Sequence, residues 1–340
     1  MDILQMITNK DRLAFSQNLS VARNYMGDTL FPDRKTENLM AEYYRLSDNL
    51  KLPTMATVHA FDTEAAIGKR PTAEKVTIEK LFIKEKINQT ERVRLLKNTG
   101  VSEQGIIEYI YDDMGRLAES VKTRTEVAKM EVLSTGKMTV KENNLNFEID
   151  YGVKASNRKS YDWSDPDHDI MNDIQEMWEQ FKTTGNTANR VVTTTKIMNI
   201  LRKNTAIQKM INSTNGVGMF VTNGQLNSLM SEVFGLTLTT NDEQYKFTNP
   251  NGTDTTRRYF PENGFVMLET TGNSLGVGLW GRTPEEEELG QYTSKSANQF
   301  ITITQWATQD PVAVWTKASG VFVPVLSDPN SLVIGKIKTA

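Results

Sequence analysis

The chain has 340 residues, of which 38% are hydrophobic and 24% charged, and its formal net charge is −3. This composition is typical of a globular protein with one to three domains. The chain contains no cysteine, which excludes disulfides, thiolate metal sites and cysteine nucleophiles. His59 and His168 are its only histidines, so we expect neither a multi-histidine metal site nor catalysis by histidine. No overall positive charge draws the chain onto nucleic acid.

The N-terminal stretch has an acid at Asp2 and no long apolar core, so we expect no secretory signal. No apolar run approaches the about 20 residues of a membrane-spanning helix. We therefore expect a protein that is made and kept in a cytoplasm. Residues 1–50 carry apolar side chains without a strong period, and Pro32 interrupts any helix there. They predict an arm that becomes ordered by lying on another part of the structure.

Residues 53–87 predict a long hairpin, in which two extended halves flank the polar turn Gly68-Lys69-Arg70-Pro71. An isolated hairpin is only marginally stable in water. From the residues alone, two arrangements stay open: a neighbouring subunit covers the hairpin, or it folds back on its own domain. Glutamates interleave with the lysines at 74–86, which favours a solvated strand face over a track for phosphates.

Residues 102–135 predict one long helix, because their apolar residues recur in steps of three and four. Ser102 is the expected N-terminal cap, and Gly136 is the expected left-handed residue after the last turn. At about 1.5 Å per residue the helix would be about 48 Å long, which suits a backbone for flanking strands. The expected apolar stripe comprises Ile107, Ile110, Met114, Leu117, Val121 and Ala128.

A second hairpin is expected over residues 137–153, turned by Asn143-Asn144, because asparagine tolerates positive φ. Residues 153–300 then predict an α+β domain. Its first helix is expected to start at Asp165-Pro166 and to include residues 169–181. Further helices are expected at 193–211 and at 224–235, with strands at 190–192 and 264–269.

From residue 300 the chain is rich in strands again, at 300–308, 312–326 and 331–337. These strands need sheet partners, and the nearest candidates are the hairpins on either side of the long helix. The α+β region would then be inserted between two parts of one strand-and-helix domain.

Gly276-x-Gly278-x-x-Gly281 has the spacing of a dinucleotide-binding motif, but that pattern alone is weak. The helix that follows carries Glu285 to Glu288 in its first turn, and four carboxylates would repel a pyrophosphate. We expect a glycine-rich turn leading into a helix that Thr283 caps.

An acidic cluster at 162–173 contains five aspartates and His168, and a hard cation is one ligand that it could hold. The glycine and distal glutamate of a calcium loop are missing, and helix capping explains most of the acids. We therefore expect no metal site. Arg257-Arg258 form a second small basic spot, and no Ser/His/Asp arrangement is visible.

Several stretches, in sequence order, resemble the major capsid proteins of lambda-type tailed phages, the capsid protein E family. The resemblance covers about 55–340 and is diffuse in the arm. The stretches are AxVHAFDTEAxIGxR at 56–70, the run from Leu133 to Gly152, Trp163-Ser164 with Asp165-Pro166 and Asp169-Ile170, and Gly281-x-Thr283-Pro284-Glu285-Glu286.

The resemblance implies an α+β fold of the Hong Kong ninety-seven type. Its parts would be an N-terminal arm at 1–50 and an extended hairpin loop at 51–89. A peripheral domain would comprise 90–152 and 300–340, with the spine helix at 102–135, and an axial domain would comprise 153–299.

The resemblance also implies the function: a major capsid protein that assembles into hexamers and pentamers of an icosahedral shell around double-stranded DNA. The implied partners are further copies of the chain, a portal protein and, as an open alternative, a decoration protein. DNA would be enclosed without sequence-specific binding, no membrane or cofactor would be involved, and assembly would take place in the bacterial cytoplasm. The inter-subunit contacts of the extended loop would be made by Phe61, Asp62, Glu64, Gly68, Lys69 and Arg70.

The arm is too short and irregular for a fused scaffolding domain, so we expect a separate scaffolding protein. Deleting residues 56–79 should leave a soluble chain that builds no shells. Two other classes remain open. A cellular encapsulin-type compartment of the same fold would package a cargo enzyme, and a soluble α+β enzyme would show a pocket with a strongly perturbed acid.

Overall fold

The computed structural model describes residues 23–38, 40–46, 55, 73–89, 93, 95–96, 98–212, 220–249, 251–270, 274–288, 294–295, 300–310 and 312–339. The chain divides into two compact units. The first comprises Met1–Ala41, Thr77–Lys129 and Val277–Val325, and the second comprises Glu42–Val76, Met130–Gly276 and Leu326–Ala340. Among the residues described, no helix is long and apolar enough to cross a membrane.

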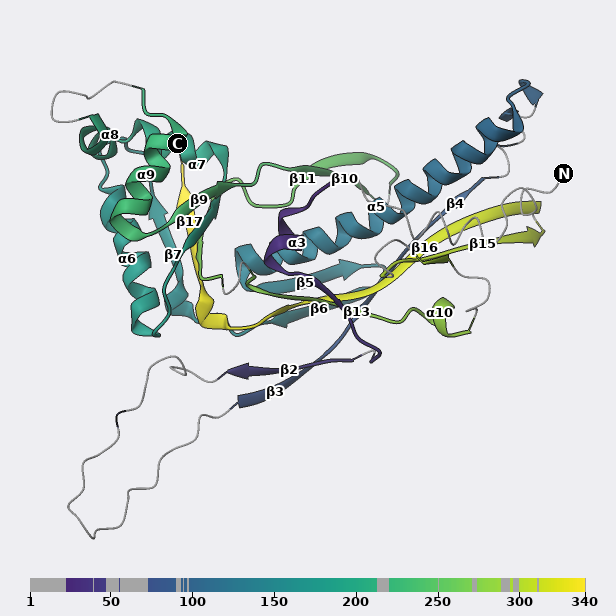
Figure 1. Cartoon of the computed structure of the whole chain (residues 1–340), viewed down its shortest axis with the longest axis horizontal. Coiled ribbons are helices and arrows are strands. Elements are labelled where there is room, and N and C mark those ends of the chain that lie inside the picture. Colours follow the sequence, from purple (N-terminus) through teal and green to yellow (C-terminus); the bar gives the residue numbers. More distant parts are fainter. Residues whose placement is uncertain are drawn as a thin grey trace, which may run out of the picture. The chain divides into compact units, whose positions relative to one another are not determined.

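The first unit is built on a six-stranded sheet (Figure 1). Its order is β1 (Asp33–Lys35), β13 (Gly276–Gly281), β16 (Val312–Leu326), β15 (Thr302–Gln309) and β14 (Ser294–Lys295), and β4 (Leu81–Asn88) also pairs with β16. The 15-residue strand β16 is antiparallel to both β15 and β4. Two short helices, α3 (Met26–Leu30) and α10 (Pro284–Glu288), also belong to this unit.

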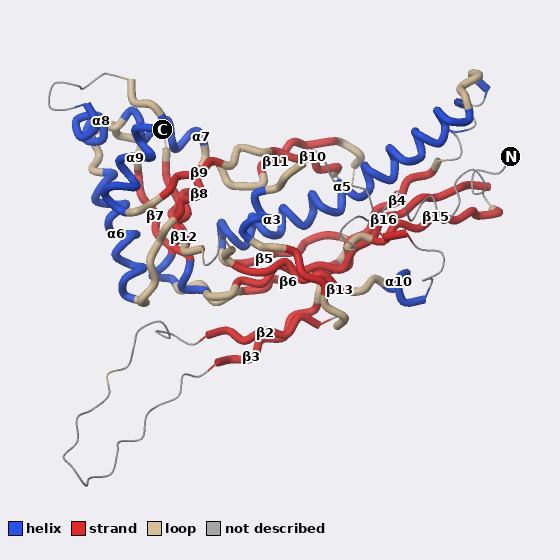
Figure 2. The backbone as a smooth tube through the Cα atoms, in the orientation of Figure 1, coloured by secondary structure: helices blue, strands red, loops and turns tan. Residues whose placement is uncertain are grey.

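Strands β2 (Met40–Leu46) and β3 (Ala73–Glu79) form a separate two-stranded ribbon. The turn and most of the first half of the hairpin expected at 53–87 lie outside the described residues. The expected second half is present as β3 and β4, which are separated at Lys80. Figure 2 shows the ribbon as two strands leading toward that stretch.

The predicted long helix is confirmed as α5 (Glu103–Thr135), 33 residues in length. Ser102 Oγ accepts a hydrogen bond from the backbone N–H of Gly105, and Gly136 has φ 68°. The apolar stripe is buried at Ile110, Met114 and the positions that follow in steps of three and four. The sequence pattern missed the charged part of the buried face, which includes Asp113, Lys122, Glu126 and Lys129.

The predicted hairpin after α5 is also confirmed, as β5 (Lys137–Glu142) and β6 (Leu145–Asp150). Asn143 and Asn144 make the turn with φ of 49° and 65°. Two successive positive φ values match the twist of a two-residue hairpin turn, and asparagine adopts them at low cost.

The second unit has a five-stranded mixed sheet in the order β7 (Arg158–Asp162), β17 (Leu332–Lys338), β12 (Gly264–Leu268), β8 (Arg190–Thr193) and β9 (Thr237–Thr240). Its helices are α6 (Ile170–Thr183), α7 (Thr195–Lys203), α8 (Thr205–Asn212) and α9 (Asn223–Phe234). A small ribbon of β10 (Gln244–Thr248) and β11 (Asp254–Arg258) is largely exposed.

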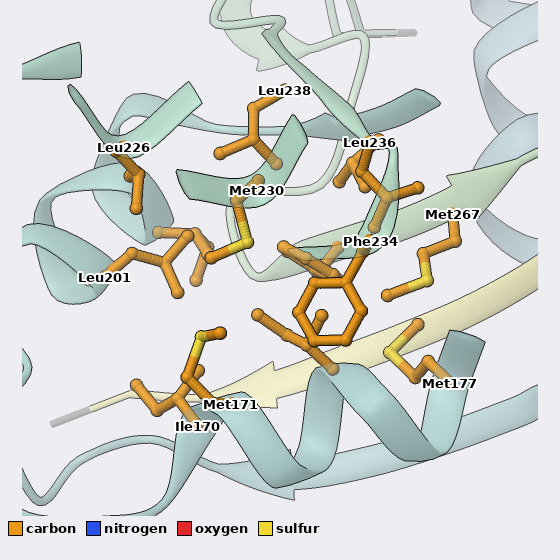
Figure 3. Packing of buried hydrophobic residues seen from close by; sticks show 14 of the residues in the cluster. Ile170, Met171, Met177, Leu201, Leu226, Met230, Phe234, Leu236, Leu238 and Met267 are labelled. Carbon is orange, nitrogen blue, oxygen red and sulfur yellow. The ribbon is translucent and has the colours of Figure 1, made fainter. Parts of the chain in front are cut away.

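The core of the second unit lies between its helices and sheet. Met177 of α6, Phe234 of α9 and Met267 of β12 converge there, as Figure 3 shows. Gly335 of β17 allows close packing, because a Cβ at that position would lie 2.8 Å from the Phe265 carbonyl oxygen.

Two helix predictions in this unit are corrected. α6 begins at Ile170, capped by Asp169, whereas Asp165-Pro166 forms a turn before it. The single helix expected at 193–211 is broken at Asn204. The Asn204 amide donates to two backbone carbonyls of the 165–169 turn, and its Oδ1 accepts from the backbone N–H of Ile207. Tertiary hydrogen bonds thus outweigh local helix propensity here.

The partners expected for the last strand are corrected as well. β16 does pair with β4, which lies in the first of the two hairpins that were expected as partners. β17 instead lies between β12 and β7, in the sheet of the second unit. All five residues of β12 and the first four of β17 are apolar and buried, as suits strands in the interior of a sheet.

Candidate assembly site

The six contact residues expected at 61–70 lie outside the described residues. The structure does describe the end of the β2–β3 ribbon where β2 begins and β3 ends. We call this end, with the start of β4, the loop root. It also describes the segment 23–38 and the sheet face that β4 and β16 share. These features together define the candidate assembly site of the first unit.

Lys80 lies at the root, between β3 and β4, and it is 3% exposed. Its ammonium group donates to Thr36 Oγ1 and to the backbone oxygen of Asn38, just before β2. Burial lowers the pKa of Lys80. These contacts join the chain entering β2 to the residue following β3. The two strands of the β2–β3 ribbon are therefore joined at the end where β2 begins and β3 ends.

Gln89 closes the far end of β4 and is completely buried. Its Oε1 accepts from Thr316 Oγ1 at 2.8 Å and from Gln305 Nε2 at 2.8 Å. Its Nε2 donates to Asp113 Oδ2 of α5 at 3.4 Å. Burial raises the pKa of the Asp113 carboxyl, although its hydrogen bond from Gln89 opposes that effect. One side chain thus ties β4 to β15, β16 and the long helix.

The segment 23–38 is attached to α5 by four charged side chains, Asp28, Asp33, Lys122 and Lys129, which we term the latch. Lys129 Nζ lies 2.6 Å from Asp28 Oδ1 and 2.9 Å from Asp33 Oδ1. Lys122 Nζ lies 2.5 Å from Asp33 Oδ2. Burial opposes the charge on Asp33, but the two ammonium groups outweigh it and hold the pKa of that carboxyl below its usual value. Lys122, Lys129 and Asp33 are largely buried, whereas Asp28 is 39% exposed, so loss of a buried member leaves a desolvated charge with fewer partners.

Gly27 allows this close approach. Its backbone N–H donates to Glu126 Oε1 at 3.0 Å, and a Cβ on Gly27 would collide with the Glu126 carboxylate. Leu30 and Phe31 are completely buried. Within the segment that was expected as an arm, residues 25–35 are therefore a packed part of the first unit.

The face of the sheet that β4, β16 and β15 share carries lysines beside aromatic rings. We call this surface the Lys–Trp face. Opposed residues of antiparallel strands share a face, and the register opposes Trp306 to Trp315 and Lys86 to Lys317. Its members are Phe82, Lys84, Lys86, Trp306, Trp315 and Lys317.

The acidic cluster at 162–173 is explained by internal contacts. Asp162 accepts from Lys338 at 2.6 Å, an interaction that lowers its pKa to about 2. Asp165 and Asp169 accept backbone N–H groups, and Asp173 contacts His168 Nε2 at 2.7 Å. Among the described residues, no group of three or more His, Cys, Asp or Glu is placed to hold a metal ion.

The glycine motif is corrected from a turn to a strand. Gly276–Gly281 is β13, and Trp280 within it is completely buried. Gly278 allows β1 to lie alongside, because a Cβ there would lie 2.8 Å from Asp33 Oδ1. The expected cap is confirmed, since Thr283 Oγ1 accepts from the backbone N–H of Glu286 at 3.2 Å. The three glycines of the motif therefore lie within the strand, and only Arg282 and Thr283 connect it to α10, whose first turn carries acidic side chains.

Solved structures share this arrangement over almost the whole chain. A protein assigned as the capsid protein of a prophage of E. coli CFT073 has a TM-score of 0.62 and 18% identity, covering 97% of this chain and 99% of that one. A phage-related protein from Bordetella bronchiseptica RB50 has a TM-score of 0.58 and 10% identity, covering 97% of both chains. The capsid of Myoviridae phage XM1 has a TM-score of 0.50 and 11% identity, covering 92% of this chain and 90% of that one.

These likenesses define the fold as the α+β fold of phage capsid proteins. The family model described as phage major capsid protein E matches residues 13–337, and the chain belongs to that family. It is therefore a phage major capsid protein, a structural component of the virion that assembles with further copies of itself. No curated protein sequence matches the chain.

Sequence reasoning did not find Lys80, Gln89 or the latch. Their partners lie 24 to 227 residues away in the chain, so no local pattern marks them. The available signal was weak: lysines at 122 and 129 interrupt the stripe of α5 at positions where apolar residues are expected.

Proposed function

We propose that this chain forms hexamers and pentamers that close the icosahedral head of a tailed phage around double-stranded DNA. The observation that carries the proposal is the family match over residues 13–337, together with a capsid fold shared over 97% of the chain. The near-neutral charge of the chain suits a container that does not hold its genome tightly. The role is structural, without catalysis.

The proposal assigns the parts of the chain as follows. Residues 1–50 are the arm and 51–89 the extended loop, while 90–152 and 300–340 form the peripheral domain and 153–299 the axial domain. Copies meet around the axial domains. The extended loop overlies a neighbouring copy through the six residues expected at 61–70.

The proposed partners are a separate scaffolding protein, a portal protein and DNA that is enclosed without sequence-specific contacts. A decoration protein is a further proposed partner. Assembly takes place in the cytoplasm of the bacterial host.

Electron microscopy and sedimentation of the chain, expressed alone and with the neighbouring phage genes, test the proposal. We expect capsomers or irregular shells from the chain alone and uniform shells with the phage genes. A monomer or dimer under both conditions would contradict the proposal. Uniform shells of one size from the chain alone would remove the need for a scaffolding protein.

A deletion separates the loop from the rest of the chain. Removing residues 56–70 leaves β2 and β3 intact, and we expect a folded chain that builds no shells. Replacing the same stretch by glycine and serine of equal length keeps the chain connection, so it reports on the side chains alone. Normal shells from both variants would show that the loop is dispensable.

A further inference from the structure

Asparagine followed by glycine occurs in the chain at Asn215, Asn223, Asn251 and Asn263. In this dipeptide the backbone nitrogen of glycine can attack the asparagine side-chain amide, because no side chain on the glycine shields that nitrogen. The product is a succinimide ring, which water opens to aspartate or isoaspartate. Asn215 lies outside the described residues. The structure places the other three asparagines in environments that differ in how freely the ring can close.

Asn263 is held by the sheet of the second unit. Its carbonyl oxygen accepts from the backbone N–H of Ile337 at 2.8 Å, and the N–H of Gly264 donates to the Pro261 carbonyl at 3.0 Å. Gly264 is buried, and a Cβ there would lie 2.6 Å from Cε1 of the Phe260 ring. Ring closure at Asn263 therefore requires β12 to separate from β17 and from Phe260.

Asn223 is the first residue of α9, directly after the N-terminal cap Thr222. Thr222 Oγ1 accepts from the backbone N–H of Gln225 at 3.3 Å, and Gln225 Oε1 accepts from the backbone N–H of Thr222 at 2.9 Å. This capping box closes the first turn of the helix. Closure of a succinimide ring needs a backbone ψ far from the helical value of about −42°. The first turn of α9 must therefore unwind before Asn223 can react.

Asn251 lies at the tip of the β10–β11 ribbon, and both Asn251 and Gly252 are exposed. A Cβ on Gly252 would meet no atom within 4 Å, so the space around the attacking nitrogen is open. That nitrogen donates to the Asn249 carbonyl at 2.9 Å, a hydrogen bond that ring closure must break. An exposed turn at a loop tip opens more readily than a helix end held by a capping box or a strand in a core sheet.

Thr253 polarises the Asn251 amide. Asn251 Oδ1 accepts from the backbone N–H of Thr253 at 3.1 Å and from Thr253 Oγ1 at 2.6 Å. This Asx turn folds the Asn251 side chain back over the Gly252 peptide. Both donors also stabilise the negative charge that develops on Oδ1 when the Gly252 nitrogen attacks.

We propose that Asn251 is a site of spontaneous deamidation, at which the exposed tip converts to aspartate or isoaspartate after folding. The Gly252 nitrogen forms a bond to Asn251 Cγ, the Cγ–Nδ2 bond breaks, and the proton of the Gly252 nitrogen leaves with Nδ2 as ammonia. Water then adds across one of the two C–N bonds of the imide. Asn249 cannot react in this way, because Pro250 has no N–H.

The two products differ in their effect on the ribbon. Aspartate adds a negative charge but keeps an oxygen that accepts from Thr253. Isoaspartate places one additional carbon in the main chain, which displaces Thr253 from Asn249, whose N–H donates to the Thr253 carbonyl at 2.9 Å. We expect the isoaspartate form to exchange its amide hydrogens faster over residues 244–258. Because the reaction takes place in a single folded chain, it is independent of the proposed function.

Peptide mapping of the full-length folded chain, kept at mildly alkaline pH and sampled over days, tests the proposal. Trypsin releases residues 247–257, and tandem mass spectrometry locates the conversion within them. We expect Asn251 to convert at least about fivefold faster than Asn223 and Asn263 in the folded chain. In denaturant the three rates should converge, because the protection by helix and sheet is lost. Equal rates in the folded chain, or a faster reaction at Asn223 or Asn263, would overturn the proposal.

Two variants separate the chemistry from the fold. Asn251→Gln keeps an amide but cannot form the five-membered ring, and it should remove the mass gain from residues 247–257. Thr253→Val removes the hydroxyl donor but keeps the backbone donor, and it should slow the conversion at least about threefold. Thr256→Val, at an exposed position of β11, is the matched control and should leave the rate unchanged. A mass gain that persists in Asn251→Gln would overturn the assignment of the site, and an unchanged rate in Thr253→Val would contradict the activation by Thr253.

Discussion

Lys129 Nζ lies 2.9 Å from Asp33 Oδ1, across 96 residues of sequence, with the lysine side chain completely buried and the aspartate side chain 10% exposed. Burial disfavours both charges, and each charge compensates the other. The pKa of Lys129 is therefore raised despite its burial, and that of Asp33 is lowered. This pair fixes the start of β1 to the C-terminal third of the long helix.

Breaking the pair on one side should be costly. Lys129→Met leaves the buried carboxylate of Asp33 with Lys122 alone, and we expect a loss of about 3–5 kcal/mol in the free energy of unfolding. Lys129→Met/Asp33→Asn removes both charges and should cost less than the sum of the single changes. Denaturant unfolding of the unassembled chain measures the losses in Lys129→Met, in Asp33→Asn and in the double variant. Lys141→Met, at an exposed position near the end of β5, is the control and should change stability by less than about 0.5 kcal/mol. Additive losses would show that the two residues act independently.

Gly27 is expected to be intolerant of any side chain. A methyl group there collides with the Glu126 carboxylate and lies 2.9 Å from Lys129 Cδ. We expect Gly27→Ala to cost about 1–3 kcal/mol, as overpacking does. Gly224→Ala is the matched control in exposed α9, where the nearest atom lies 3.9 Å away, and it should be neutral or slightly stabilising. Equal effects of the two variants would argue against the close packing at Gly27.

Lys80 should control the order of the loop root more than the stability of the whole chain. Lys80→Met removes the donor to Thr36 and Asn38 but also a desolvated charge, so the two effects partly offset in global unfolding. Amide hydrogen exchange of residues 36–46 should become about tenfold faster, which corresponds to about 1.4 kcal/mol of local stability. Lys84→Met, four residues further and exposed, serves as the control. Unchanged exchange in the Lys80 variant would show that the contacts of Lys80 with Thr36 and Asn38 do not order this segment.

Asp113 should make stability depend on pH in the opposite sense to Asp33. Burial raises the pKa of Asp113 in the folded chain above its value of 3.8 in the unfolded chain. The carboxyl therefore costs no stability below pH 3.8, and it lowers the free energy of unfolding as the pH rises through the folded-state pKa. At pH 7 Asp113→Asn should therefore stabilise the chain, by about 1 kcal/mol. The gain should disappear toward pH 3, where the native carboxyl is protonated. Denaturant unfolding across this range measures it, with Glu108→Gln, at an exposed position of the same helix, as the control. A gain that does not depend on pH would show that ionisation is not its cause.

Local patterns were sufficient where the physical cause is local. The spacing of apolar residues and the caps at Ser102 and Gly136 predicted α5, because helix period and termini depend on neighbours within a few residues. Asn143-Asn144 predicted the β5–β6 turn for the same reason. The resemblance of ordered motifs predicted the capsid fold and the family, which the family match confirms.

Local signals failed where a distant group decides. The carbonyls of the 165–169 turn break the helix at Asn204, although the sequence at 193–211 reads as continuous helix. β17 pairs with β12 and β7, and strand composition alone does not select among possible partners.

The sequence by itself determined the long helix, the β5–β6 hairpin, the fold family and the function that follows from the family. Only the tertiary structure decided which charges are buried and which are exposed. Lysines at 129 and 80 are held inside, and those at 84 and 86 face outward. The reason is physical: a charge is buried only where a partner far along the chain compensates its loss of water, and strand alternation divides neighbouring charges between two faces.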